Sequence, residues 1–471
     1  MRILQLLKEN KTIITGLLGI ILGIIIANTK PPSELTVEAM QALGIFAGAV
    51  VWWIYEVAPD YVTALLMCTS WVTFEVVPFN IAFASFSNTT FWLLVGAFGI
   101  GVVVSKSGLL NRISLFILSK FPATFAGQTA ALLISGNLIA PTIPSVTAKV
   151  AIVAPFAKSI SDKLGYPDKS KENAGIFSAM FMGFGASGPL FLSASFMCYT
   201  MLGLLPETIS STVTWMSWLK SSFIWGFIVL VGSYITIQLL YKPSKPDQMD
   251  STYMKTEFKN LGPLSKEEKI VLLVLSMALL LWMTEKVHGI AAAIVALTAL
   301  CVLLGLKIID RTDFRTGIAW DSVIFIGGII NLATVFPALN IDRWIVSLIG
   351  PHMASLTANI YLFIAVTAII IYLVRLVIVS QIATVTIFTV LMTPFAIQAG
   401  INPFVPAFII LCSVNTWNVI YQNSTYLTAY YASGEMVDFP QTIKMSISYM
   451  IISLIGLLFS IPLWKVLGMI P

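Results

Sequence analysis

Charged residues are scarce in this sequence: they make up 10% of its 471 residues, whereas 58% are hydrophobic. A soluble domain usually contains about 25% charged residues, so the composition excludes a soluble globular protein and predicts a polytopic membrane protein. The net charge of +5 is the ordinary surplus of lysine and arginine on the cytoplasmic side of such proteins. We therefore expect a lipid bilayer as the surroundings and no nucleic-acid partner.

Histidine and cysteine are scarce as well. The chain has two histidines and four cysteines, and no two cysteines have the Cys-x-x-Cys spacing of redox or metal sites. Apolar residues surround every cysteine, which favours packing roles. The sequence also lacks a cluster of histidine and carboxylate residues that would indicate catalysis. We expect no cofactor, no metal centre and no enzymatic activity.

Long hydrophobic runs are abundant. Scanning in windows of about 19 residues predicts spans at 12–28, 38–58, 61–80, 90–108, 215–241, 269–287, 289–306, 321–338 and 441–466. Only the segment 242–269 looks soluble, and it carries six lysines: Lys242, Lys245, Lys255, Lys259, Lys266 and Lys269. The excess of lysine predicts that this linker is cytoplasmic, with the N-terminus on the same side of an inner (plasma) membrane.

The linker separates two halves, 1–241 and 270–471, that share three patterns in the same order. The matches pair WWIYE with LWMTE, FWLLVGAFGI with SVIFIGGIIN, and SVTAKVAIVAPF with TVTIFTVLMTPF. Recurrence in the same order indicates a duplication. An odd number of predicted spans lies between the copies, so the second copy should be inverted in the membrane. Glu56 and Glu285, which end the first pair of patterns, are interpreted as interfacial or structural residues.

Two apolar blocks, 123–205 and 357–430, are interrupted by proline and polar residues. Lysines flank the first part of the first block on both sides, which predicts a re-entrant hairpin at about 123–157. A broken helix at about 173–205 follows it. The second half repeats this order, with a hairpin at about 357–398 and a broken helix at about 403–430.

The polar residues of the hairpins predict an anion site. A helix that begins at Ser145 or at Thr384 would direct the positive end of its dipole at an anion. Hydroxyl side chains there can donate to a carboxylate without adding charge. Inverted repeats with broken helices are typical of secondary transporters, in which the substrate is held where such tips meet.

The stretch IAPTIPSVTAK (139–149), together with the paired hairpins, resembles the divalent anion/sodium symporter family over essentially the whole chain. The resemblance implies an all-α fold of about eleven spans and two hairpins, a homodimer, an elevator-type mechanism and transport of dicarboxylates, citrate or sulfate. The family's Ser-Asn-Thr motif at each tip binds the substrate and, in symporters, sodium. By position it falls on Ser145, Val146 and Thr147 and on Thr384, Val385 and Thr386.

Valine stands where the family has asparagine in both assigned motifs, and valine offers no oxygen to sodium. The stretch SQIATVT, with Ser380, Gln381 and Thr386, resembles the antiporter branch of the family, the citrate/succinate and 2-oxoglutarate/malate translocators. We therefore expect sodium-independent exchange. Sodium-coupled symport of a dicarboxylate or of sulfate stays an alternative, because backbone carbonyls also bind sodium.

Two cations lie inside apolar segments. Lys149 follows Ser145 by about one helical turn, and Arg375 precedes the second tip. An ionisable residue in a span is costly and is usually paired or functional. Each cation is predicted either to neutralise a dianionic substrate in place of sodium or to play a structural role.

Further candidate contacts lie in the broken helices. In the first half they are the small residues Ser187, Gly188 and Ser193, for which close helix packing is the alternative. In the second half they are Asn415, Tyr421 and Gln422, for which a hydrogen-bonded structural turn is the alternative.

The sequence thus predicts a secondary active transporter of small di- or tricarboxylates. An anion channel is less favoured, because a channel needs a continuous polar lining and the sequence offers two isolated tips.

Overall fold

The computed structural model describes residues 2–32, 34–244, 249–250 and 252–471, so Lys245 of the linker lies outside the described residues. The described residues form α-helices joined by turns and short irregular segments, without a β-strand among them. Six helices in this part of the chain are long and apolar enough to cross a membrane, and several shorter apolar helices accompany them. The predicted all-helical, polytopic class is confirmed, whereas the number of eleven spans stays a prediction.

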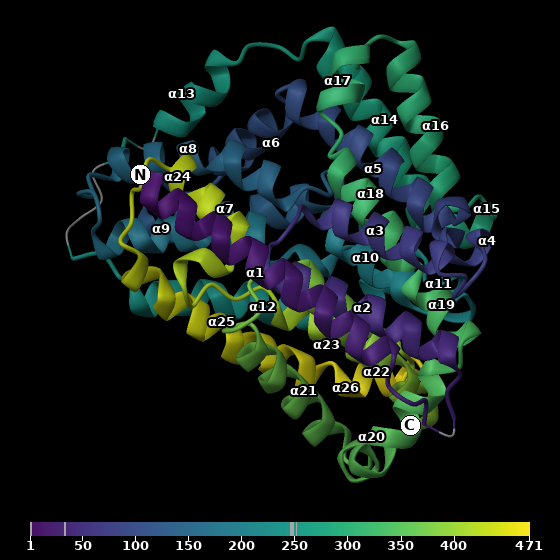
Figure 1. Cartoon of the computed structure of the whole chain (residues 1–471). Helices are drawn as coiled ribbons and strands as arrows, with labels where there is room; N and C mark the ends of the chain where they lie inside the picture. Colours follow the sequence, from purple (N-terminus) through teal and green to yellow (C-terminus); the bar gives the residue numbers. More distant parts are fainter. Residues whose placement is uncertain (1, 33, 245–248, 251) are drawn as a thin grey trace.

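Twelve α-helices precede the linker (Figure 1): α1 Arg2–Ala27, α2 Val37–Tyr55, α3 Asp60–Thr73, α4 Phe79–Ala82, α5 Thr89–Lys106, α6 Leu109–Leu118, α7 Phe125–Ile139, α8 Val146–Leu164, α9 Lys171–Phe181, α10 Phe196–Leu204, α11 Glu207–Ser210 and α12 Trp215–Leu240. Short turns interrupt this order: 3₁₀ turns at Ala84–Ser87, Ala140–Thr142, Gly188–Leu190 and Leu192–Ala194, and a π-helical turn at Met182–Ala186.

Fourteen α-helices follow: α13 Tyr253–Asn260, α14 Lys266–Met283, α15 Glu285–His288, α16 Ala292–Gly305, α17 Arg311–Thr316, α18 Trp320–Ile330, α19 Leu332–Ala338, α20 Ile341–Thr357, α21 Ile360–Val374, α22 Gln381–Gln398, α23 Phe404–Ser413, α24 Ser424–Ala432, α25 Phe439–Phe459 and α26 Ile461–Val466. A single 3₁₀ turn, Ile420–Gln422, precedes α24.

The linker is folded against the first half. Its helix α13 packs against α6, and the side chain of Arg112 on α6 donates to the carboxylate of Glu268 on α14 at 2.6 Å. The same guanidinium donates to the carbonyl oxygens of Leu261 and Gly262 at 3.2 and 2.8 Å. A single arginine therefore holds the end of the linker and the start of the next apolar helix together.

The first hairpin consists of α7 and α8, with the break between Ile139 and Val146. Proline lacks the backbone N–H that a continuing helix needs, and two prolines lie in this break. The arm was predicted to end near residue 157, but α8 continues to Leu164. Lys158 and Asp162 form an ion pair one turn apart on α8, which supports the helix. Gly165 ends it in the left-handed conformation.

The second hairpin consists of α21 and α22, and here one prediction is wrong. A helix was expected to begin at Thr384, but α22 begins at Gln381, with Ser380 as its N-cap. The oxygen atom of the Ser380 side chain accepts a hydrogen bond from the backbone N–H of Ala383 at 3.2 Å. Serine is a favoured N-cap residue for this reason, so it starts the helix one turn earlier than expected.

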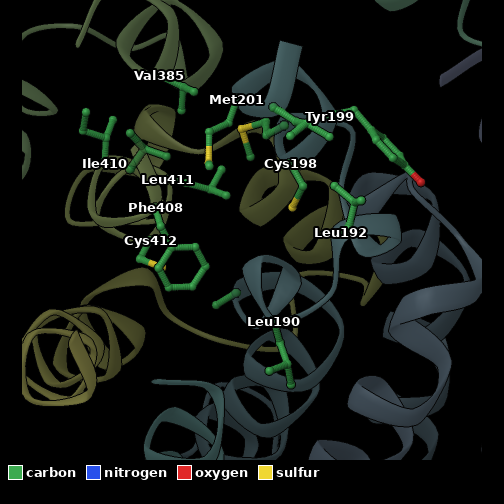
Figure 2. Packing of buried hydrophobic residues seen from close by; sticks show 14 of the residues in the cluster. Leu190, Leu192, Cys198, Tyr199, Met201, Val385, Phe408, Ile410, Leu411 and Cys412 are labelled. Carbon is green, nitrogen blue, oxygen red and sulfur yellow. The ribbon is translucent and has the colours of Figure 1, made fainter. Parts of the chain in front are cut away.

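Both broken helices are interrupted between two helical pieces. In the first half α9 leads through the π-helical and 3₁₀ turns to α10, and in the second half α23 leads through a short turn to α24. The pieces pack on each other across the two halves (Figure 2). Cys198 and Met201 of α10 lie in one buried apolar cluster with Val385 of α22 and Leu411 of α23. The core therefore joins the two sets of helix breaks.

Candidate functional site

Four helices that belong to the hairpins and broken helices begin at one large cavity of about 1010 Å³, where α3 begins as well. The helices are α8, α10, α22 and α24, two from each half of the chain, and the first residues of each line the cavity. The rest of the lining comes mainly from α1, from the end of α2, from the start of α3 and from the connection between α2 and α3. The lining residues are Thr12, Thr15, 54–60, Val146, Thr147, 195–197, 379–382, Tyr421, Gln422, Ser424, Thr425 and Leu427.

The two hairpin helices present the same kind of N-terminus to the cavity. Ser145 caps α8 by accepting from the N–H of Ala148 at 3.2 Å, as Ser380 caps α22. Each capping bond satisfies one of the four N–H groups that have no partner within their own helix. The other N–H groups of the first turn likewise have no acceptor within the helix, so they can donate to a ligand that reaches them. Val146 and Thr147 of α8 line the cavity, together with Gln381 of α22.

The broken helices contribute two further N-termini, which the sequence prediction missed. Ser195 caps α10 by accepting from the N–H of Met197 at 3.2 Å, and Asn423 caps α24 by accepting from the N–H of Tyr426 at 3.0 Å. Ser195 itself and Thr425 of α24 line the cavity. A capping residue directly before an apolar run was the available signal, but both helices are too short to stand out in a hydropathy scan.

A hydroxyl pair links the two halves at the cavity. The side-chain oxygens of Thr147 on α8 and Thr425 on α24 lie 3.3 Å apart, within hydrogen-bonding distance. Both side chains line the cavity, and a hydroxyl group can donate as well as accept. The pair therefore places one hydroxyl from each half at the cavity, and while the two are bonded to each other one of their protons stays free to donate to a carboxylate.

The convergence of these four helix N-termini favours negative charge on their side of the cavity. Each helix N-terminus is equivalent to about half a positive charge, so four of them favour an anion strongly when they face one space. Backbone N–H groups at helix N-termini commonly bind phosphate, sulfate or carboxylate groups. The cavity thus has the donors and the field of an anion site.

Lys149 lies behind the first tip and is fully buried. Its ammonium group donates to the carbonyl oxygen of Ala194 at 2.8 Å and to that of Ala140 at 3.4 Å. Both carbonyls belong to helix breaks, and that of Ala140 also accepts from the backbone N–H of Ile143 at 3.4 Å. No carboxylate within the described residues forms an ion pair with Lys149, so its positive charge is not neutralised by the protein there.

Arg375 plays the corresponding part at the second tip. It is 1% exposed, and its guanidinium donates to the carbonyl oxygens of Val414 at 3.1 Å and Ile378 at 2.6 Å, and also to those of Val379 and Gln422. The side chain of Gln422 returns a bond to the carbonyl oxygen of Arg375 at 2.8 Å. Arginine and glutamine thus hold the hairpin break against the break before α24.

Neither Lys149 nor Arg375 is among the residues that line the large cavity. Each contacts carbonyl oxygens of the helix breaks, so both cations have a structural role in the breaks. This role leaves their charge in place, because carbonyl oxygens are dipoles and not counterions.

The small residues of the first broken helix pack behind the first hairpin tip, where two of them form hydrogen bonds. The hydroxyl of Ser193 donates to the carbonyl oxygen of Pro141 at 2.7 Å and accepts from the indole N–H of Trp215 at 3.0 Å. Ser187 donates to the carbonyl oxygen of Gly183 at 2.8 Å. Gly188 lines a smaller neighbouring cavity that shares Val146 and Thr425 with the large one. Of the three residues, Gly188 is the one that lines one of these two cavities.

The second motif is shifted along α22 from its assigned position. Thr384, Val385 and Thr386 are all fully buried and absent from the cavity lining. Thr384 donates back to the carbonyl oxygen of Ser380 at 2.9 Å, and Val385 belongs to the apolar cluster of Figure 2. The residues at the second tip are instead Ser380 and Gln381.

This shift changes which residue follows each capping serine. It is Val146 at the first tip but Gln381 at the second. The amide nitrogen of Gln381 donates to the carbonyl oxygen of Val414 at 3.1 Å and to the side-chain oxygen of Asn415 at 3.3 Å. Asn415 lines the smaller cavity and Tyr421, which is exposed, lines the large one. The second tip therefore has one side-chain amide, and the first tip has none.

Helices broken at a shared cavity, with buried cations behind the breaks, are typical of membrane transporters. The comparison with known families agrees. The chain matches the sodium:sulfate symporter transmembrane region over residues 10–470, and it belongs to that family. The resemblance drawn from the sequence is thereby confirmed.

Similar proteins are transporters and membrane proteins as well. The chain is 26% identical to dicarboxylate transporter 2, chloroplastic, of Spinacia oleracea over 471 residues, which cover 98% of this chain and 84% of that protein. It is 25% identical to the inner membrane protein YbhI of Escherichia coli over 344 residues, covering 70% and 72%. A transporter, and not an enzyme, is confirmed by the family and its members.

A solved structure shows the same type of fold. The YdaH transporter of Alcanivorax borkumensis aligns with a TM-score of 0.54 at 16% identity, covering 80% of this chain and 85% of that one. At this identity the similarity concerns the fold alone.

Proposed function

We propose that this protein exchanges small dicarboxylates across a membrane, without sodium. The observation that carries the proposal is the single cavity at which four helix N-termini meet, with the uncompensated charges of Lys149 and Arg375 behind it. The helix N-termini and the two positive charges both stabilise a bound anion. The similarity to a chloroplastic dicarboxylate transporter supports a carboxylate as the substrate.

The fixed cations supply the countercharge that sodium supplies elsewhere. Holding a dianion inside a membrane protein without positive charge nearby is very costly. Lys149 and Arg375 together carry as much charge as the two carboxylates of a dicarboxylate, so a mobile cation is not needed to offset the charge of the substrate. The empty site keeps its positive charge, which disfavours movement of the unloaded carrier and couples transport in one direction to transport in the other.

The side chains at the first tip do not favour sodium. Sodium requires several oxygen ligands, and Val146 contributes none from its side chain. Gln381 at the second tip offers one amide oxygen, while its nitrogen is bonded to Val414 and Asn415. This single amide is the observation in favour of the second candidate, a sodium-coupled symporter of dicarboxylates or sulfate.

The mechanism we propose is of the elevator type in a homodimer. The four helices that begin at the cavity, with their hairpin partners α7 and α21, would move as one body past the wall formed by α1 and the α2–α3 connection. The two halves would be inverted repeats. The N-terminus and the linker 242–269 would face the cytoplasm of a cell with an inner membrane.

Uptake into proteoliposomes tests this function. Purified protein is reconstituted in vesicles that are preloaded with unlabelled malate or left empty, and radioactive malate is added outside. We expect uptake only into the preloaded vesicles, at the same rate in sodium, potassium or choline chloride. Strong uptake into empty vesicles that depends on a sodium gradient would instead establish the symporter, and sodium-independent uptake with a steady electrical current would establish a channel.

A further inference from the structure

The cavity proposed for an anion has an unexpected wall. The only charged side chains among its described lining residues are two carboxylates, Glu56 and Asp60. They lie at the end of α2 and at the start of α3, in the part of the lining that does not belong to the hairpins or broken helices. Neither carboxylate has an ion pair or a side-chain hydrogen bond with any residue that the structure describes. Their charges therefore act on the contents of the cavity.

A comparison with the matching pattern in the second half shows that this arrangement is not required by the fold. Trp53 donates to the carbonyl oxygen of Asp60 at 3.3 Å, and Trp282 donates in the same way to that of Ala292 at 3.1 Å. In both halves the indole thus ties the end of one helix to the first residue of the next. The tryptophans have equivalent structural roles.

The glutamates of the two patterns have different roles. The side chain of Glu285 accepts from the N–H of Ala292 at 3.3 Å and so caps α16. Glu56 makes no such bond; it ends α2 in the left-handed conformation, with φ of 51°, and its side chain is exposed at the cavity. A non-glycine residue in this conformation is uncommon and marks a special position. Glu56 therefore does not have the capping role that Glu285 has in the second half.

We propose that Glu56 and Asp60 select substrates by charge and make this a site for dicarboxylates in preference to tricarboxylates. This inference rests on the proposed function, and it narrows the substrate class. The helix N-termini and the buried cations attract any anion, and more highly charged anions most strongly. The acidic wall opposes this attraction in proportion to the charge of the anion, so it penalises a trianion such as citrate more than a dianion such as malate.

The expected change in affinity on removing one carboxylate follows from Coulomb's law. One pair of like charges about 10 Å apart in a water-filled cavity lowers affinity by about a factor of two. Removing one carboxylate should therefore raise affinity by about fourfold for a dianion and about eightfold for a trianion. The preference for malate over citrate should fall by about a factor of two.

Isothermal titration calorimetry on the purified full-length protein tests this at pH 7.5 and low salt, with malate and citrate as ligands. Glu56→Gln removes the charge and keeps the size of the side chain. Glu285→Gln is the matched control, because it makes the same change in the corresponding pattern away from the cavity. For Glu56→Gln we expect affinity to rise about fourfold for malate and about eightfold for citrate, and for Glu285→Gln we expect no change. In 0.5 M potassium chloride the difference in affinity between Glu56→Gln and the wild type should disappear, since salt at that concentration screens charges beyond about 4 Å.

Several outcomes would contradict the inference. Equal gains for malate and citrate would indicate a change of shape and not of charge, and unchanged affinities would show that Glu56 does not act on the ligand. If Glu56→Gln does not elute as the folded protein, Asp60→Asn carries the same prediction. Wild-type protein that binds neither ligand would refute the proposed function itself, whereas binding with an unaltered preference in the variants refutes the charge selection alone.

Discussion

Replacing Lys149 by glutamine is the sharpest test of the fixed-charge mechanism. The lysine follows the capping residue Ser145 by four positions, which is about 6 Å along the helix axis. A carboxylate held at the tip would thus lie about 8 Å from the ammonium group, where one charge pair contributes about 2 kcal/mol at an effective dielectric constant of about 20. Loss of the charge should weaken malate binding about 30-fold.

The assay combines calorimetry with malate exchange in preloaded vesicles. Glutamine can still donate to one of the carbonyl oxygens of Ala140 and Ala194, so the break should stay folded and the protein should elute as the wild type does. Lys158→Gln is the matched control: it makes the same substitution on the same helix, at a lysine that is paired with Asp162 and Asp168. We expect this variant to bind malate normally.

A Lys149→Gln protein that binds and exchanges malate at wild-type levels would refute the reasoning for this residue. The countercharge would then have to come from Arg375 and the helix N-termini. A variant with weakened binding but sodium-stimulated uptake would show that a mobile cation can replace the fixed one.

Three further predictions follow from the contacts at the tips. Thr147→Ala should weaken malate binding about tenfold in calorimetry by removing a donor to a charged group, and Thr425→Val should do so to a smaller degree; unchanged affinity in both would place the substrate elsewhere. Thr386→Ala should leave the dissociation constant unchanged, because this hydroxyl is buried away from the cavity without a hydrogen-bond partner; a tenfold weakening would restore the position assigned from the sequence. Arg375→Gln should lower the melting temperature in a thermal unfolding scan, because each buried carbonyl oxygen left without a donor costs about 1–3 kcal/mol. The bond from Gln422 to the backbone carbonyl of residue 375 stays possible in this variant. An unchanged melting temperature would contradict the structural role of the guanidinium in the helix breaks.

The helical class and the positions of the breaks could be predicted from the sequence, because hydropathy and proline act locally. The first tip was placed correctly at Ser145, which the structure shows as the N-cap of α8. The second was placed one turn too late, because Thr384, Val385 and Thr386 resemble the motif in composition. Only the capping bond of Ser380 distinguishes the true start of α22, and capping depends on backbone geometry.

The partners of the buried cations were beyond sequence reasoning for a different reason. A sequence does not show which backbone carbonyl oxygens can accept a further bond, and those that Lys149 and Arg375 contact lie where helices end. The contribution of Ser195 and Thr425 was hidden in the same way, since it arises when short helices from separate halves are brought to one cavity. The difference between Glu56 and Glu285 was also hidden, because the two sequence patterns are alike and only the contacts of the two side chains differ.

The bonds behind the first tip have a consequence for how a solute reaches it. The backbone N–H of Phe196 donates to the carbonyl oxygen of Pro144 at 2.9 Å, and Ser193 holds Pro141 from the same side. A Cβ atom added to Gly136 of α7 would overlap the backbone of Gly183 in the π-helical turn, so the hairpin and the broken helix touch main chain to main chain. Lifting the tip like a flap would break these contacts, so the proposed opening of the site is a movement of the hairpins and broken helices together, past α1 and the α2–α3 connection.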